Sequence, residues 1–110
     1  MNDDVIIGLY DKIVLLLRIQ SSPRLIINNN RSWYGAYYPD SNVIRISRYM
    51  HRVSRQYRRI DATIELIDTI CHELAHVMYT GHDSKHTKLT KQYVNTVLDC
   101  TRLTVDVEVL

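Results

Sequence analysis

Cysteine, proline and glycine are all scarce in this chain of 110 residues, which holds two cysteines, two prolines and three glycines. Cys71 and Cys100 are too few for a disulfide framework and lack the spacing of a metal site, so we expect Cys71 to pack as a small apolar residue. No repeat and no low-complexity linker interrupts the sequence. The expected organisation is therefore one domain, residues 1–110.

Long hydrophobic runs are missing too. The most apolar stretch, residues 13–17, has charged neighbours and is far shorter than the roughly twenty residues that cross a bilayer. Asp3 and Asp4 stand near the N-terminus, where a secretory signal would have a basic start. We therefore expect no signal peptide, no membrane association and an intracellular setting, either cytoplasmic or nuclear.

The composition and the spacing of apolar residues predict a small α+β fold. Hydrophobic residues make up 45% of the chain and charged residues 24%, which suits a single core. Helical spacing predicts a first helix over residues 5–17, stopped before Pro23, a long helix over residues 60–78 and another over residues 86–100. Strand signals fall at residues 24–28, 32–38 and 43–47, and the alternation at residues 103–109 predicts a last strand.

The run His72-Glu73-Leu74-Ala75-His76 lies in the long predicted helix. Residues four apart share one helix face, so His72 and His76 can offer both imidazoles to one metal ion. Glu73 would then lie beside the open coordination position, where it can take a proton from an activated water and pass it to a leaving amine. Glu73 is the predicted catalytic residue, although such a pentapeptide also occurs by chance as solvated histidines on an ordinary helix.

A third ligand has to come from outside that helix face, and His82 is the candidate. Gly81 is well placed to end the helix in a left-handed conformation that reverses the chain, and His82 follows it directly. Three histidines leave a fourth zinc position for water, which is the arrangement of a catalytic site. The predicted cofactor is Zn2+, held by His72, His76 and His82.

These residues resemble the SprT-like and WLM (Spartan-type) zinc metallopeptidases. The matching segments are residues 70–76 and 82–89, and the spacing from His76 to His82 is closest to WLM-type members. The resemblance implies a small zincin-like domain with an N-terminal helix, a short three-stranded sheet, an active-site helix with the HExxH motif and a C-terminal helix. It also implies His82 as the third ligand. His86 stands where the family usually has phenylalanine or tryptophan, so it is either an alternative ligand or a packing residue.

The resemblance further implies a cleft for a protein or peptide substrate. In zincins an edge strand ahead of the motif helix pairs with an extended substrate, and residues 43–47 are our candidate, the alternative being an ordinary core strand. Tyr79 or one of the strand tyrosines could donate to an oxyanion. Asp83 either orients a ligand imidazole or caps the next helix.

Residues 45–59 contain six arginines, although the net charge of the whole chain is only +2. If this segment is helical, four of them share a face that can contact successive phosphates of DNA, the alternative being a solvated face paired with carboxylates. These four are Arg48, Arg52, Arg55 and Arg59. The leading hypothesis is a zinc endopeptidase that acts on DNA-bound or DNA-crosslinked proteins. The alternative is a DNA-binding module with a structural zinc site and no proteolytic activity, and the sequence leaves the oligomeric state open.

Overall fold

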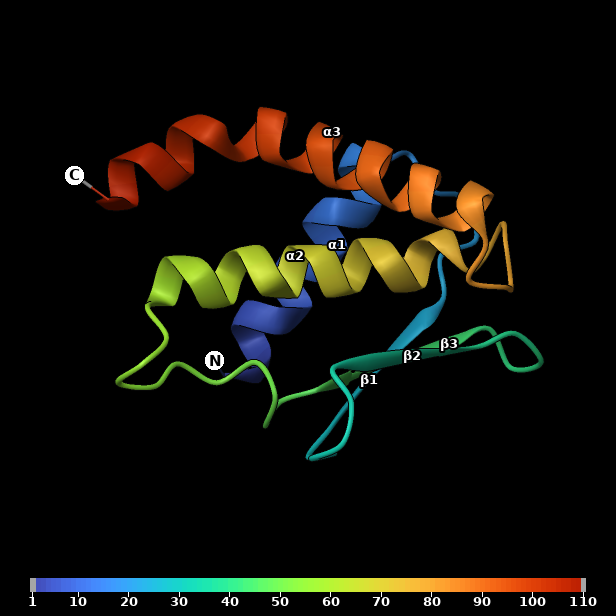
Figure 1. Cartoon of the computed structure of the whole chain (residues 1–110), viewed down its shortest axis with the longest axis horizontal. Helices are drawn as coiled ribbons and strands as arrows, with labels where there is room; N and C mark the ends of the chain where they lie inside the picture. The colour runs from blue at the N-terminus through green and yellow to red at the C-terminus, as the bar shows by residue number, and fades with distance from the viewer. Residues whose placement is uncertain (1, 110) are drawn as a thin grey trace.

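The computed structural model describes the backbone of residues 2–109 and the side chains of residues 2–100. Its elements are α1 (Asp3–Leu16), β1 (Arg24–Asn28), β2 (Gly35–Tyr38), β3 (Val43–Ser47), α2 (Arg59–Ala75) and α3 (Ser84–Val109). The helix α2 runs through the middle, with α3 along one side of it, the sheet on the other and α1 crossing behind (Figure 1). Three helices and one three-stranded sheet make up the described part of a small α+β fold, as predicted.

The first helix forms as predicted but ends before proline requires it to end. Its start is capped by the side chain of Asn2, which accepts a backbone N–H of the first turn. Its end is set by Arg18, whose φ of 54° is left-handed, and the N–H of Ile19 donates to the carbonyl of Val14 at 3.1 Å. A left-handed residue followed by this hydrogen bond ends the helix, and glycine is the residue usually found at such a position.

The order of the sheet is β1-β3-β2, so β3 is the central strand. It pairs in parallel with β1 and antiparallel with β2. The prediction that residues 43–47 form the edge strand beside the cleft is therefore wrong. The physical reason lies in burial, because every residue of β3 except Arg45 is buried, as in a strand covered on both faces.

The strand β2 begins at Gly35, three residues later than predicted. The side chain of Asn30 accepts the N–H groups of Ser32 at 2.7 Å and of Trp33 at 3.1 Å. Such an asparagine turn gives these backbone groups a local partner in place of a neighbouring strand. The chain can therefore join the sheet only beyond Trp33.

The predicted strand at residues 103–109 is also wrong, because the backbone of α3 continues to Val109. No glycine or proline occurs between residues 84 and 109, so nothing local stops a helix that has already started. The alternating valines of this segment express a strand propensity that is only realised beside another strand.

The arginine-rich segment is not a helix, so the predicted single face of Arg48, Arg52, Arg55 and Arg59 does not form. The N–H of Met50 donates to the hydroxyl of Ser47 at 3.1 Å, which starts a turn, and a short bridge joins residues 54 and 57. The guanidinium of Arg48 instead binds the carboxylate of Asp3 through two hydrogen bonds of 2.6 and 2.7 Å. Turn-forming contacts and this ion pair prevail over helical spacing.

The core lies where α2 meets the other elements. Its fully buried members include Ile6, Ile13, Ile44, Ile46, Leu66, Ile70, Cys71 and Leu74. Cys71 packs as a small apolar residue, as predicted, and burial raises the pKa of its thiol to about 12. Among the described residues, no helix has the length and the apolar composition that crossing a membrane would require.

The edge strand β2 approaches α2 closely at Gly35. A Cβ atom at this position would lie 2.8 Å from Cγ2 of Thr69, 3.2 Å from Cδ1 of Ile46 and 3.3 Å from the carbonyl oxygen of Arg45. Contacts of this length do not fit a packed interior. The absence of a side chain at residue 35 therefore allows β2 to lie against the helix that carries the histidine motif.

We expect Gly35→Ala to destabilise the protein by about 1–3 kcal/mol, because the added methyl group overpacks this contact. Gly8→Ala is the matched control, since a Cβ there has no atom within 4 Å and alanine is the better helix residue. Urea unfolding of both variants measures the difference. A free energy of unfolding for Gly35→Ala at or above that of the unmodified protein would contradict the proposed contact.

Candidate metal centre

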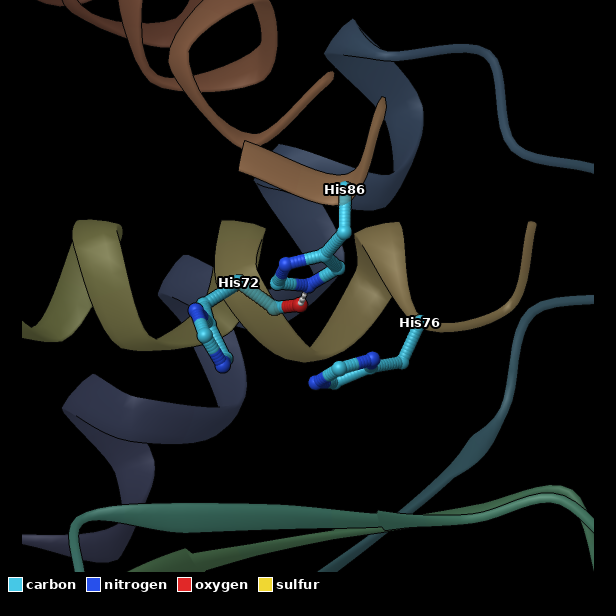
Figure 2. Close-up of side chains that lie close together, drawn as sticks. All are labelled: His72, His76 and His86. Atoms are coloured by element: carbon cyan, nitrogen blue, oxygen red, sulfur yellow. Dashed lines mark hydrogen bonds between the residues drawn. The ribbon is translucent and has the colours of Figure 1, made fainter. Parts of the chain in front are cut away.

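Four histidines gather where α2 ends and α3 begins. His72 lies in the last turn of α2, and His76 follows that helix directly. His82 belongs to the connection between the helices, and His86 lies in the first turn of α3. Figure 2 shows the rings of His72, His76 and His86 close together, with His86 reaching toward α2 from the neighbouring helix. The structure thus brings together all three predicted ligands and the alternative one.

The end of α2 differs from the prediction. The helix ends at Ala75, six residues before Gly81, and none of the glycines has a positive φ. The N–H of His76 donates to the carbonyl of Glu73 at 3.1 Å, and the next two residues repeat this three-residue spacing. A tight 3₁₀ turn therefore ends the helix, and no left-handed glycine is needed.

The ring of His76 is held in one tautomer. Its Nδ1 lies 3.0 Å from the carbonyl oxygen of Tyr79, and a carbonyl can only accept, so Nδ1 carries the proton. The lone pair is then on Nε2, which faces Nε2 of His82 at 3.2 Å. Tyr79 therefore contributes its main chain to the centre. No sequence signal could have predicted this role, because every residue has a carbonyl group.

The ring spacing of His72, His76 and His82, the predicted ligands, is compatible with one tetrahedral metal ion. Two imidazole nitrogens at about 2.0–2.1 Å from a zinc ion lie about 3.3 Å apart, and their ring centres about 5 Å apart. The His76 and His82 nitrogens meet this spacing at 3.2 Å. The three ring-centre distances are 4.9, 5.3 and 4.6 Å.

Distance and ring orientation give different indications for His86 as a ligand. Ligand nitrogens of His72, His76 and His86 lie within 4.8 Å of one another, so distance allows a ligand set with His86 as the third member. The rings of His76 and His86, however, are stacked 3.9 Å apart at 16°. Because a ring nitrogen directs its lone pair in the plane of the ring, two stacked rings do not point at one ion. The rings of His72 and His82 are also inclined by only 28°, although their centres lie 5.3 Å apart, so both His82 and His86 remain candidates for the third position and His82 stays the predicted ligand.

Burial sets the protonation of the centre. Burial and the three neighbouring histidines lower the pKa of His72 to about 4, and burial lowers the pKa of His76. Neutral imidazoles are the form that binds metal ions. Glu73 is 6% exposed, and burial raises its pKa to about 7. The site therefore combines two imidazoles that burial keeps neutral, those of His72 and His76, with one buried carboxyl group.

A cleft of about 300 Å³ opens between the end of α2 and the edge strand β2. Glu73 and the predicted ligands line one wall, and Gly35, Ala36 and Tyr37 line the other. Sequence reasoning missed the second wall, because strand signals do not tell which strand is the edge. The hydroxyl group of Tyr37 donates to the side chain of Asn42 at 2.9 Å, so this strand tyrosine already has a partner.

Asp83 is a helix cap, one of its two predicted roles. Its carboxylate accepts the backbone N–H of His86 at 3.0 Å. The arginines predicted to contact DNA are not among the residues that line the cleft. Arg52 lies over the ring of Tyr49 at 4.2 Å, and Arg55 and Arg59 are exposed.

Comparison with known proteins identifies one family. The model of the WLM domain matches residues 43–105, which is more than half of the chain and includes the histidine motif, His82 and His86. No curated protein and no solved structure matches the chain. The resemblance to WLM-type proteins inferred from the motif is thereby confirmed, and a cluster of histidines able to hold a metal ion accompanies it. The protein belongs to the WLM domain family, which is metallopeptidase-like.

Proposed function

We propose that the protein is a zinc-dependent endopeptidase of the SprT/WLM type. His72, His76 and His82 hold the zinc ion in this proposal, and Glu73 moves the proton. The observation that carries it is the 3.2 Å approach of the His76 and His82 nitrogens, with the first ring fixed in the metal-binding tautomer. A buried carboxyl group beside them lines the same cleft.

The zinc site and Glu73 have separate roles in the proposed reaction. A zinc ion in this site would polarise a peptide carbonyl and lower the pKa of a water to roughly 7. Glu73 follows His72 on the last full turn of α2 and lines the cleft, so its carboxylate accepts the proton of the attacking water. It then gives that proton to the leaving amine.

The edge of β2 is the proposed binding site for the substrate backbone. In the described sheet β2 pairs only with β3, which leaves its other edge open beside the cleft. The N–H of Ser47 donates to the carbonyl of Tyr34 at 2.9 Å, so residue 34 turns its polar groups toward β3. Along an antiparallel pair of strands, residues that bond to the partner strand alternate with residues whose N–H and C=O groups point away from it. Gly35 and Tyr37 therefore direct their backbone polar groups toward the open edge. An extended peptide can add to the sheet at these two residues.

We expect Glu73→Gln to bind zinc as the unmodified protein does and to lose peptidase activity by about 10²–10⁴-fold, because it removes the general base and keeps the ligands. Zinc content and cleavage of an unfolded protein substrate are measured together. Asp68→Asn is the matched control, since Asp68 is exposed on the same helix. Equal activity in Glu73→Gln and in the control would contradict the assigned role.

We expect N-methylation of single backbone amides in a peptide substrate to reduce kcat/KM at every second position. Each lost hydrogen bond costs about 0.5–1.5 kcal/mol, or roughly 2- to 13-fold. The positions between serve as internal controls, because their N–H groups would face away from β2. A scan with equal effects at consecutive positions would argue against strand addition.

DNA contact is a second candidate role, and one observation favours it. The guanidinium groups of Arg31 and Arg52 both lie over the ring of Tyr49, at 4.7 and 4.2 Å. Tyr34 stands exposed in the same cavity as Tyr49 and Arg52. Cations and aromatic faces together are the elements that bind single strands. We propose that this surface, and not a helical stripe, brings DNA-bound proteins to the cleft.

We expect Arg52→Ala to weaken binding of single-stranded DNA and to lower the slope of log K against log salt by about 0.7, the value for one phosphate contact. Arg24→Ala, which removes an exposed arginine from β1, is the control for net charge. Equal losses of DNA affinity in the two variants would indicate a general electrostatic attraction of DNA without a specific binding site. DNA binding together with an inactive, zinc-loaded protein would instead favour a binding module.

A further inference from the structure

The tight turn at the end of α2 releases the carbonyl group of His72. In a regular α-helix this carbonyl would accept the N–H of His76, four residues later. Here that N–H donates to Glu73, three residues back, at 3.1 Å. A carbonyl at a helix end that loses its helical partner needs another donor when water is excluded.

His86 supplies that donor from a different helix. Its Nε2 lies 3.0 Å from the carbonyl oxygen of His72, as the dashed line in Figure 2 marks. Because the carbonyl only accepts, Nε2 of His86 carries the proton. His86 as a residue is 2% exposed, so this hydrogen bond is shielded from water.

The same ring also lies flat against His76, with centres 3.9 Å apart and planes 16° apart. One imidazole of α3 therefore touches both histidines of the motif, through a hydrogen bond to His72 in α2 and ring stacking on His76 just after that helix. Its own position is anchored, because its N–H donates to Asp83 at 3.0 Å and its carbonyl accepts the hydroxyl of Thr90 at 2.9 Å.

We propose that His86 is a positioning residue of the metal centre. It fixes the main chain of His72 and the ring plane of His76, and so sets the angle at which the two ligands meet the ion. The inference rests on the proposed function, since it takes His72, His76 and His82 as the ligands. A phenylalanine at this position could stack on His76 but could not donate to the carbonyl of His72. The hydrogen bond therefore depends on the Nε2–H of the His86 imidazole.

Two variants of His86 separate the effect of its N–H donor from the effect of its aromatic ring. His86→Phe keeps an aromatic face without a donor, and His86→Gln keeps an N–H near the position of Nε2. We expect His86→Phe to weaken zinc affinity by roughly 10- to 100-fold, as loss of a partner behind a ligand does, and His86→Gln to restore most of it. Competition with a chromophoric chelator measures affinity, and the visible spectrum of the Co2+ form reports ligand number and geometry.

Val97→Ala is the matched control for stability. Val97 is fully buried in the same helix and does not line the cleft, so the variant should lower the melting temperature and leave zinc affinity unchanged. Melting of each metal-free variant shows that it is folded at the assay temperature. If His86→Phe is not folded there, His86→Met makes the same comparison, because it also fills space without an N–H donor.

Native zinc affinity in His86→Phe would overturn the positioning role. A loss in His86→Gln as large as in His82→Ala, with a Co2+ spectrum that reports one nitrogen ligand fewer, would make His86 a ligand and also overturn it. Absence of zinc from the unmodified protein would overturn the proposed function together with this inference. Tight zinc binding by the unmodified protein with no effect of residue 86 would overturn this inference alone.

Discussion

The burial of α2 between the sheet and α3 is the constraint on which the rest of the molecule depends. Leu66, Ile70 and Leu74 on this helix are fully buried, so its rotation about its own axis is set by packing. Once that rotation is set, His72 and Glu73 have only one direction to face, which is the cleft beside β2. The chemistry of the site follows from hydrophobic packing several residues away.

A helix end inside a protein carries polar groups that need hydrogen-bond partners, and here those groups bind the histidines of the candidate metal centre. The carbonyl of Tyr79 accepts from His76, and the carbonyl of His72 accepts from His86. Each bond fixes a ring together with its tautomer. Asp83 in turn caps α3 and holds His86 in place. Backbone carbonyl groups at the end of α2 and in the turn after it thus orient the imidazoles, which would otherwise rotate.

The cleft depends on a second close contact, between β2 and α2. Gly35 allows the strand to lie against the helix, and β3 holds the strand on its other side. This arrangement leaves the free edge of β2 facing the histidines, which is where an extended peptide could pair. Substrate binding and metal binding would then depend on the same packing of β2 against α2, because α2 carries His72, is followed directly by His76 and also lines the cleft.

Local patterns in the sequence determined most of the elements and the candidate ligands. The spacing of apolar residues predicted α1, α2 and most of α3, and the bounds of β1 and β3 matched. Spacing by four residues also predicted that His72 and His76 would share a helix face, because helix geometry is a local property. The pairing order of the strands was decided by contacts between distant residues. The tight turn after Ala75 and the turns of the arginine-rich segment rest on local hydrogen bonds that the spacing of apolar residues does not reveal. Only the tertiary structure placed His82 and His86 beside His72 and His76, because the relative orientation of rings from separate elements is not encoded in sequence spacing.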